Sequence, residues 1–304
     1  MTMRLITLAL AALVAQQPAP PPGSVASRLT LDVVAVDRDG APVADLRPEE
    51  IEVWISGYRV PVDDVAFITP ETAPRTVVLL LDNVAVGPEL AIRVRETARA
   101  FVRELGERDR VSVGPVEGPR IDGTGEPARL LQAIEKYYPQ GFPLRIEDAG
   151  EHVLRLLTAT AQQMIEIPGR KAIVAIGAAW LFDTPLPPPG LRDLRDVWLT
   201  AMRSMAAANV SLYVIDPVGI RPMRGFSYAG DGGFASETGG YAFLNTNDPA
   251  EAARRIVGES GTYYLLRMAN PPVQLSADLR KVEVKMLRKN VTVRVRRGIP
   301  GRSP

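Results

Sequence analysis

The chain has 304 residues, of which 46% are hydrophobic and 23% are charged, and its formal net charge is +1. This is the composition of a globular protein, and the near-zero charge argues against nucleic acid as a partner. The chain contains no cysteine, which excludes disulfides, thiol catalysis, cysteine-ligated zinc and a lipid anchor attached to cysteine.

The first 15 residues have the pattern of a secretory signal. Arg4 supplies a positive charge, and the apolar run that follows ends at Ala15. This run is shorter than the roughly 20 residues of a membrane-spanning helix, although an uncleaved anchor is an alternative. Residues 16–27 follow as a Pro-rich linker, either a tether or a remnant without a role. We therefore expect an exported protein, periplasmic or secreted, with no transmembrane span in the mature chain.

Residues 28–67 have the pattern of a small β element. Leu29, Leu31, Val33 and Ala35 occupy every second position of the first strand, and Asp39-Gly40 then marks a turn. A second strand is predicted at 51–55 and a third at 60–67. The element is too short to be stable alone.

Between residues 74 and 267, strand-like apolar runs alternate with amphipathic helices. Strands are predicted at 76–81, 110–116, 171–176, 211–215, 241–244 and 261–267, and helices at 88–105, 127–137, 148–165, 191–208 and 249–258. Near-continuous apolar strands indicate burial on both faces. The alternation predicts the α/β class, with a doubly wound, mostly parallel sheet flanked by helices.

The C-terminal residues 278–298 return to a β pattern. Apolar residues occupy alternate positions from Val282 to Met286 and from Val291 to Val295, with a turn at 288–290. This pattern predicts a β-hairpin with one buried face. We expect the hairpin to pack with the N-terminal β element into one small β domain, because neither is stable alone, with the α/β domain inserted between them.

Several segments, taken in order, resemble a known family. They are residues 33–53, 74–83, 170–174, 237–240 and 293–298. Their order and spacing resemble the exported bacterial proteins with a VWFA-related domain. The resemblance implies a Rossmann-like von Willebrand factor type A (vWA) fold, with a metal-ion-dependent adhesion site at the carboxyl ends of the strands.

The resemblance also implies a ligand set, which this chain has largely lost. The family motif is Asp-x-Ser-x-Ser after the first strand, a threonine in a later loop and an aspartate after the fourth strand. Asp82 is retained, whereas the other ligand positions fall on Val84, Val86, Pro143 and Ala178. One carboxylate with water binds a divalent cation weakly. We therefore expect no cofactor and no intact metal site, and weak Mg²⁺ or Mn²⁺ binding is the alternative.

We expect the candidate binding residues at the same carboxyl edge of the sheet. Asp82 is expected to cap the following turn, and the alternative is that it faces a binding groove. Asp148, Asp183 and Asp216 are candidates for a rebuilt cation site. The loop at 217–233 carries apolar side chains, either as a partner contact or as a cover for the sheet. The candidate binding surface consists of Asp82, Asn83, Asp148, Met223, Phe226 and Tyr228.

Two further patterns bear on function. His152, the only histidine, lies four residues from Asp148 and could pair with it to serve a nucleophilic serine, but no Gly-x-Ser-x-Gly elbow is present and Ser260 lacks a strand-then-helix setting.

Residues 280–302 hold nine basic side chains against Glu283 alone. The basic hairpin is a candidate contact for anionic surfaces, and protection of an exposed strand against aggregation is the favoured explanation.

The sequence thus predicts a non-enzymatic module of the bacterial cell envelope that binds a protein or a glycan. Recognition would use the carboxyl edge of a vWA-like sheet without a metal, through Asp82, an apolar Val84–Val86 surface and the loop at 217–233. A cation-dependent adhesin with an altered ligand set is the alternative, and a hydrolase that uses His152 is a third hypothesis.

Overall fold

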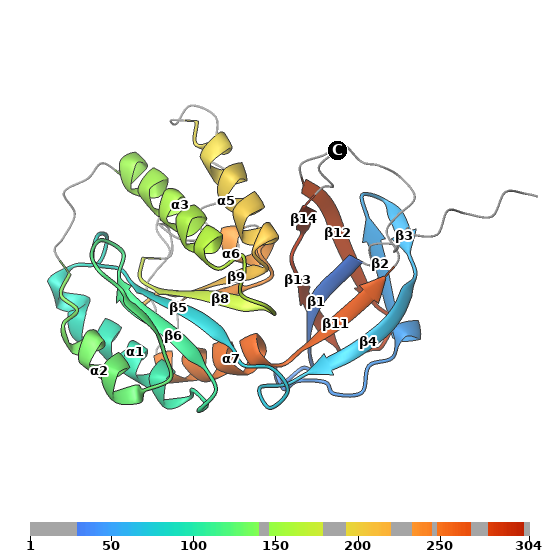
Figure 1. Cartoon of the computed structure of the whole chain (residues 1–304), viewed down its shortest axis with the longest axis horizontal. Helices are drawn as coiled ribbons and strands as arrows, with labels where there is room; N and C mark the ends of the chain where they lie inside the picture. The colour runs from blue at the N-terminus through green and yellow to red at the C-terminus, as the bar shows by residue number, and fades with distance from the viewer. Residues whose placement is uncertain are drawn as a thin grey trace, which may run out of the picture.

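A computed structural model describes residues 29–139, 146–178, 193–219, 233–244, 248–268 and 279–300. These residues form an α/β lobe and a β-sandwich lobe that lie side by side (Figure 1). The predicted signal and the Pro-rich linker lie outside the described residues. None of the described helices has both the length and the apolar character of a membrane span.

The α/β lobe is built on a six-stranded sheet with the order β10-β9-β8-β5-β6-β7. The strands are β5 (Thr76–Leu81), β6 (Arg110–Pro115), β7 (Ile121–Thr124), β8 (Lys171–Ile176), β9 (Val210–Ile215) and β10 (Tyr241–Phe243). All neighbours are parallel except β7, which pairs antiparallel with β6. Every residue of β8 and β9 is buried, which explains why all of them except Lys171 and Ser211 are hydrophobic. The predicted doubly wound, mostly parallel sheet is confirmed.

Helices cover both faces of this sheet (Figure 1). One face carries α1 (Ala91–Arg103), preceded by η2 (Pro88–Leu90), with α2 (Pro127–Glu135) and α7 (Pro249–Gly261), and the other carries α3 (Ile146–Gln163), α5 (Arg195–Ala207) and α6 (Phe234–Glu237). Each face has its own apolar cluster. Successive strand residues alternate between the clusters, as Leu79 and Leu80 of β5 do.

The second lobe is a sandwich of two four-stranded sheets, ordered β13-β1-β11-β4 and β14-β12-β2-β3. Its elements are β1 (Leu29–Val36), η1 (Pro48–Glu50), β2 (Ile51–Ile55), β3 (Tyr58–Val60), β4 (Val62–Ile68), β11 (Tyr263–Met268), β12 (Leu279–Met286), β13 (Thr292–Val295) and β14 (Gly298–Pro300). A third apolar cluster fills the space between the two sheets. Segments from both ends of the chain contribute strands to each sheet.

The structure corrects three details of the predicted β region. β11, predicted as the last strand of the α/β domain, pairs with β1 and β4 in the sandwich. β12 and β13, predicted as a hairpin, lie in different sheets, because β12 pairs with β2 and β14 whereas β13 pairs with β1. The strand predicted at 60–67 is divided between β3 and β4, which also join different sheets. Alternation identifies a buried face but does not choose the neighbouring strand.

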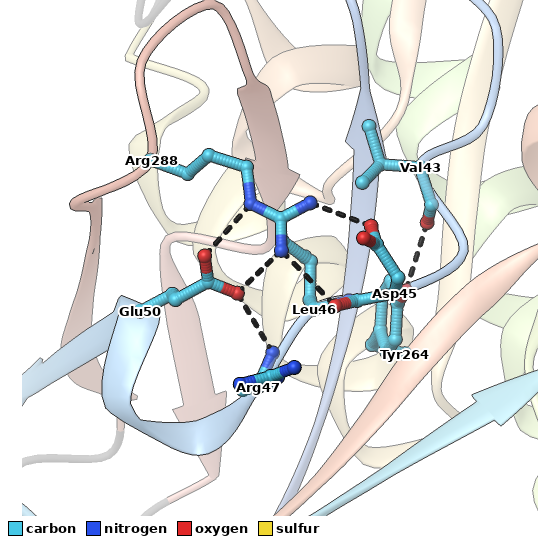
Figure 2. A network of polar contacts seen from close by, with 7 residues as sticks. All are labelled: Val43, Asp45, Leu46, Arg47, Glu50, Tyr264 and Arg288. Atoms are coloured by element: carbon cyan, nitrogen blue, oxygen red, sulfur yellow. Dashed lines mark hydrogen bonds and ion pairs between the residues drawn. The ribbon is translucent and has the colours of Figure 1, made fainter.

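Arg288 ties the turn after β12 to the loop before β2 (Figure 2). Its guanidinium donates to both carboxylate oxygens of Glu50, at 2.8 and 2.6 Å, and to the side chain of Asp45 at 2.5 Å. The bonds from Arg288 hold the pKa of Glu50 below its ordinary value. On the same loop, the backbone N–H of Leu46 donates to the hydroxyl of Tyr264 at 3.1 Å. These contacts fix a loop that has little regular structure of its own.

A polar network connects the two lobes. Asn209 follows α5 with a left-handed φ of 52°, and its side-chain amide donates to Asp32 of β1 at 2.6 Å. The amide oxygen of Asn209 accepts a hydrogen bond from Arg296. Nearby, Glu259 of α7 forms an ion pair with Arg294 of β13. Because Asp32, Arg296 and Glu259 are buried, loss of one partner would leave a costly unpaired group at the junction.

Candidate functional site

Asp82 follows β5 at the carboxyl edge of the sheet, where open α/β sheets bind their ligands. Its side chain is fully buried, at 0% exposure. Oδ1 accepts the backbone N–H groups of Val84 at 3.0 Å and Ala85 at 2.8 Å, and Oδ2 accepts that of Ala178 at 3.0 Å. Asp82 therefore caps the turn after β5 and joins it to the turn after β8.

Gly177 allows these two turns to approach each other. A Cβ atom at position 177 would lie 2.2 Å from the Cβ atom of Asp82, closer than nonbonded carbons can approach. The carbonyl oxygen of Asp82 also accepts the hydroxyl hydrogen of Tyr137 at 2.5 Å. The two strand ends are thus locked by one side chain, one glycine and one tyrosine.

The electrostatics of Asp82 are those of an enclosed carboxylate. Burial raises its pKa above the ordinary value, against the three backbone N–H donors that lower it, and the nearby carboxylate of Asp216 raises it further. Burial also raises the pKa of Tyr137. Desolvation disfavours the charged form in both cases.

The other positions of the expected ligand set are apolar and enclosed. Val84 belongs to the apolar cluster on one face of the sheet and Val86 to the cluster on the other, and Ala178 is also buried. Asn83 is buried as well, and its amide exchanges hydrogen bonds of 2.9 and 3.0 Å with the backbone of Glu117. The prediction that Asp82, Asn83 and the two valines form an exposed recognition surface is therefore wrong.

The described residues do not gather the remaining candidate ligands into a metal-binding group. Asp216 is buried, and its side chain accepts the backbone N–H of Val218 at 2.9 Å. Asp148 lies on α3. The described ranges contain no group of three or more His, Asp or Glu side chains arranged to hold a metal ion. The other predicted positions, Pro143, Asp183, Met223, Phe226 and Tyr228, lie outside the described residues.

His152 does not meet the candidate serine. The Nε2 atom of His152 lies 3.7 Å from a carboxylate oxygen of Glu117. Ser260 is buried on α7, where its hydroxyl donates to the carbonyl of Val257 at 3.3 Å. Since α3 and α7 cover opposite faces of the sheet, this histidine and this serine do not form a catalytic pair (Figure 1).

The basic C-terminal residues are largely engaged within the chain. Besides the Arg288 and Arg294 ion pairs, Arg297 contacts Glu237 at 3.1 Å. Arg296 is buried, and desolvation lowers its pKa to about 10. Most of the basic side chains that suggested a surface for an anionic partner are thus paired with acids of the same chain or buried.

Sequence reasoning missed a pocket next to the Asp82 turn. Its volume is about 560 Å³, within the range of small-ligand sites. It lies between α2 and the hairpin that joins β6 to β7. Its charged lining residues are Glu117, Arg120, Arg129 and Lys136. The available signal was the helical spacing of Arg129 on α2 and Lys136 just after its end, which are about two turns apart.

No protein-family model matches the chain, and no curated protein matches it. Solved structures do show similarity. An aerotolerance-related membrane protein from Bacteroides fragilis is 16% identical, over 60% of this chain and 97% of its own, with a TM-score of 0.38. A von Willebrand factor type A protein from Catenulispora acidiphila is 11% identical, over 88% and 72%, with a TM-score of 0.44.

Manganese-loaded TRAP protein from Plasmodium vivax is 14% identical, over 79% of this chain and 98% of its own, with a TM-score of 0.36. The chain is thus similar to proteins with a vWA domain, which is the resemblance that the sequence indicates. At these identities the similarity concerns the fold alone.

Proposed function

We propose that this chain is a non-enzymatic interaction module of the bacterial cell envelope, which binds a protein or a glycan without a metal ion at the sheet edge. The observation that carries the proposal is the state of the Asp82 carboxylate. An ionised carboxylate has about four acceptor sites, and three of them already receive backbone N–H groups.

Coordination by Asp82 would require a cation to displace at least part of this cap. Mg²⁺ also requires near-octahedral oxygen geometry. Val84, Val86 and Ala178 offer no side-chain oxygen at the positions where the family has ligands. Binding of a cation at this edge would therefore break hydrogen bonds that Asp82 already accepts, and the cation would gain only one carboxylate ligand. Both effects disfavour binding.

The non-enzymatic part of the proposal follows from the separation of His152 and Ser260. The envelope location follows from the sequence pattern of the first 15 residues and the Pro-rich linker after them. A binding role is thus supported by the export pattern of the sequence, by the distance between His152 and Ser260 and by the described residues, which gather no metal ligand set.

Thermal unfolding of residues 16–304, in EDTA and then in millimolar Mg²⁺ or Mn²⁺, tests the metal-free proposal. A metal present at a hundred times the Kd of its site adds about 2.7 kcal/mol of stability. For a chain of this size that is a rise in Tm of roughly 4–6 °C. We expect a change below about 1 °C.

Three variants distinguish the alternatives. A metal-induced rise in Tm that disappears in Asp82→Asn would refute the metal-free proposal. A rise that persists there but disappears in Asp148→Ala or Asp216→Ala would identify an adhesin with an altered ligand set. Comparing the metal-induced change within each variant removes the effect of the substitution on stability itself.

A further inference from the structure

The pocket between α2 and the β6–β7 hairpin is cationic. Its lining contains three basic side chains and one acid, Glu117, which already lies 3.7 Å from His152. The acid on α2 itself, Glu135, is held on another side by Arg99 of α1, at 2.6 and 2.8 Å. The pocket therefore carries a positive potential that an anionic ligand would neutralise.

One of the three bases has a structural role. The guanidinium of Arg120 donates to the hydroxyl of Thr160 on α3 at 2.9 Å, which anchors the hairpin to that helix. Gly114 of β6 lets the hairpin fold close, since a Cβ atom there would lie 2.8 Å from the Cα atom of Arg120. The wall formed by the hairpin is thus fixed before a ligand arrives.

The two remaining bases are available. Arg129 and Lys136 are exposed, and neither forms an ion pair with any residue that the structure describes. They are seven residues apart, so their Cα atoms are separated by roughly 10 Å along the helix axis. Tyr138, which is 66% exposed, provides an aromatic surface at the Lys136 end of the pocket.

This spacing matches an extended peptide better than a single anion. A polyproline II segment repeats every three residues with a rise of about 3.1 Å, so acids three residues apart lie on one face at about 9 Å. Aromatic surfaces are the usual partners of such segments. We propose that the pocket binds an acidic extended segment of a partner protein, whose carboxylates reach Arg129 and Lys136. This inference rests on the proposed interaction function and assigns it a surface and a partner chemistry.

The test uses the mature chain and a fluorescein-labelled peptide of repeated Glu-Pro-Pro triplets, with binding followed by fluorescence anisotropy. We expect saturable binding that weakens as salt is added, and no binding of the matched Gln-Pro-Pro peptide. Arg129→Gln and Lys136→Gln should each weaken binding about tenfold, because each removes one charge-assisted contact. Arg59→Gln, at an exposed arginine of β3 in the other lobe, is the matched control and should bind normally.

Absence of peptide binding, or binding unchanged in both pocket variants, would overturn this inference. A uronic-acid oligosaccharide that binds in place of the peptide, and that is lost in the same variants, would also overturn it by assigning the pocket to glycans. These outcomes leave the metal titration unaffected, so failure of the pocket can be separated from failure of the metal-free proposal.

Discussion

The contact between Gly177 and Asp82 gives the sharpest test of how the sheet edge is built. Gly177→Ala places a Cβ atom 2.2 Å from the Cβ atom of Asp82. The φ of Gly177 lies outside the left-handed region, so alanine meets no backbone restriction and the cost comes from this contact. Overpacking of a buried site costs about 1–3 kcal/mol. Loss of the hydrogen bond from Ala178 to Asp82 adds about 1 kcal/mol.

We therefore expect Gly177→Ala to lower the free energy of unfolding by about 2–4 kcal/mol, and the Tm by roughly 3–8 °C. Thermal unfolding followed by far-ultraviolet circular dichroism measures this change. Gly258→Ala is the matched control, because a Cβ atom there meets nothing within 4 Å and the residue lies inside α7. That variant should gain about 0.5–1 kcal/mol. Equal midpoints for the two variants would refute the reasoning about the Asp82 contact.

Three further predictions concern the same turn and the Arg288 cluster. Because burial raises the pKa of Asp82, the folded state binds this proton more tightly than the unfolded chain does. Wild type should therefore lose stability relative to Asp82→Asn as the pH rises from about 4 through the raised pKa. Urea unfolding across this range measures the difference in free energy of unfolding, wild type minus variant. A difference that grows with pH would contradict a raised pKa of Asp82. Replacing Val84 and Val86 together by serine should destabilise the protein by about 2–4 kcal/mol in chemical denaturation, without creating a rise in Tm with Mg²⁺. Arg288→Lys removes the paired bonds to one carboxylate and should speed amide exchange at Leu46; unchanged exchange there would show that Arg288 does not hold the loop.

The sequence predicted the strands of the α/β lobe best. β5 and β8 have the predicted bounds, because central parallel strands are apolar on both faces and end abruptly at polar or glycine residues. β7 was missed, since its Ile121-Asp-Gly-Thr124 sequence has neither length nor alternation. Strands at a sheet edge need little apolar surface, so their local pattern is weak.

Strand pairing in the sandwich could not be read from local pattern. Tyr263 to Met268 follows a helix of the α/β lobe, and its apolar pattern suits either lobe. Its place is decided by contacts with β1 and β4, about two hundred positions earlier in the chain. Likewise, the turn after β12 is long enough to close a hairpin or to cross to the other sheet, and the Arg288 contacts accompany the crossing. Such choices depend on three-dimensional packing rather than on periodicity.

The burial of Asp82 shows why retention of one motif residue is weak support for retained chemistry. An aspartate at a strand end can stabilise the fold by capping alone, and here its carboxylate joins the turns after two strands. Val84 and Val86 then extend the apolar clusters on opposite faces of the sheet, so the turn itself becomes part of both cores. In such a turn, a serine would place a hydroxyl in an apolar environment without a partner. This packed turn requires buried apolar side chains and a fully capped carboxylate, whereas an open metal site requires accessible oxygen ligands. One turn cannot meet both requirements at once.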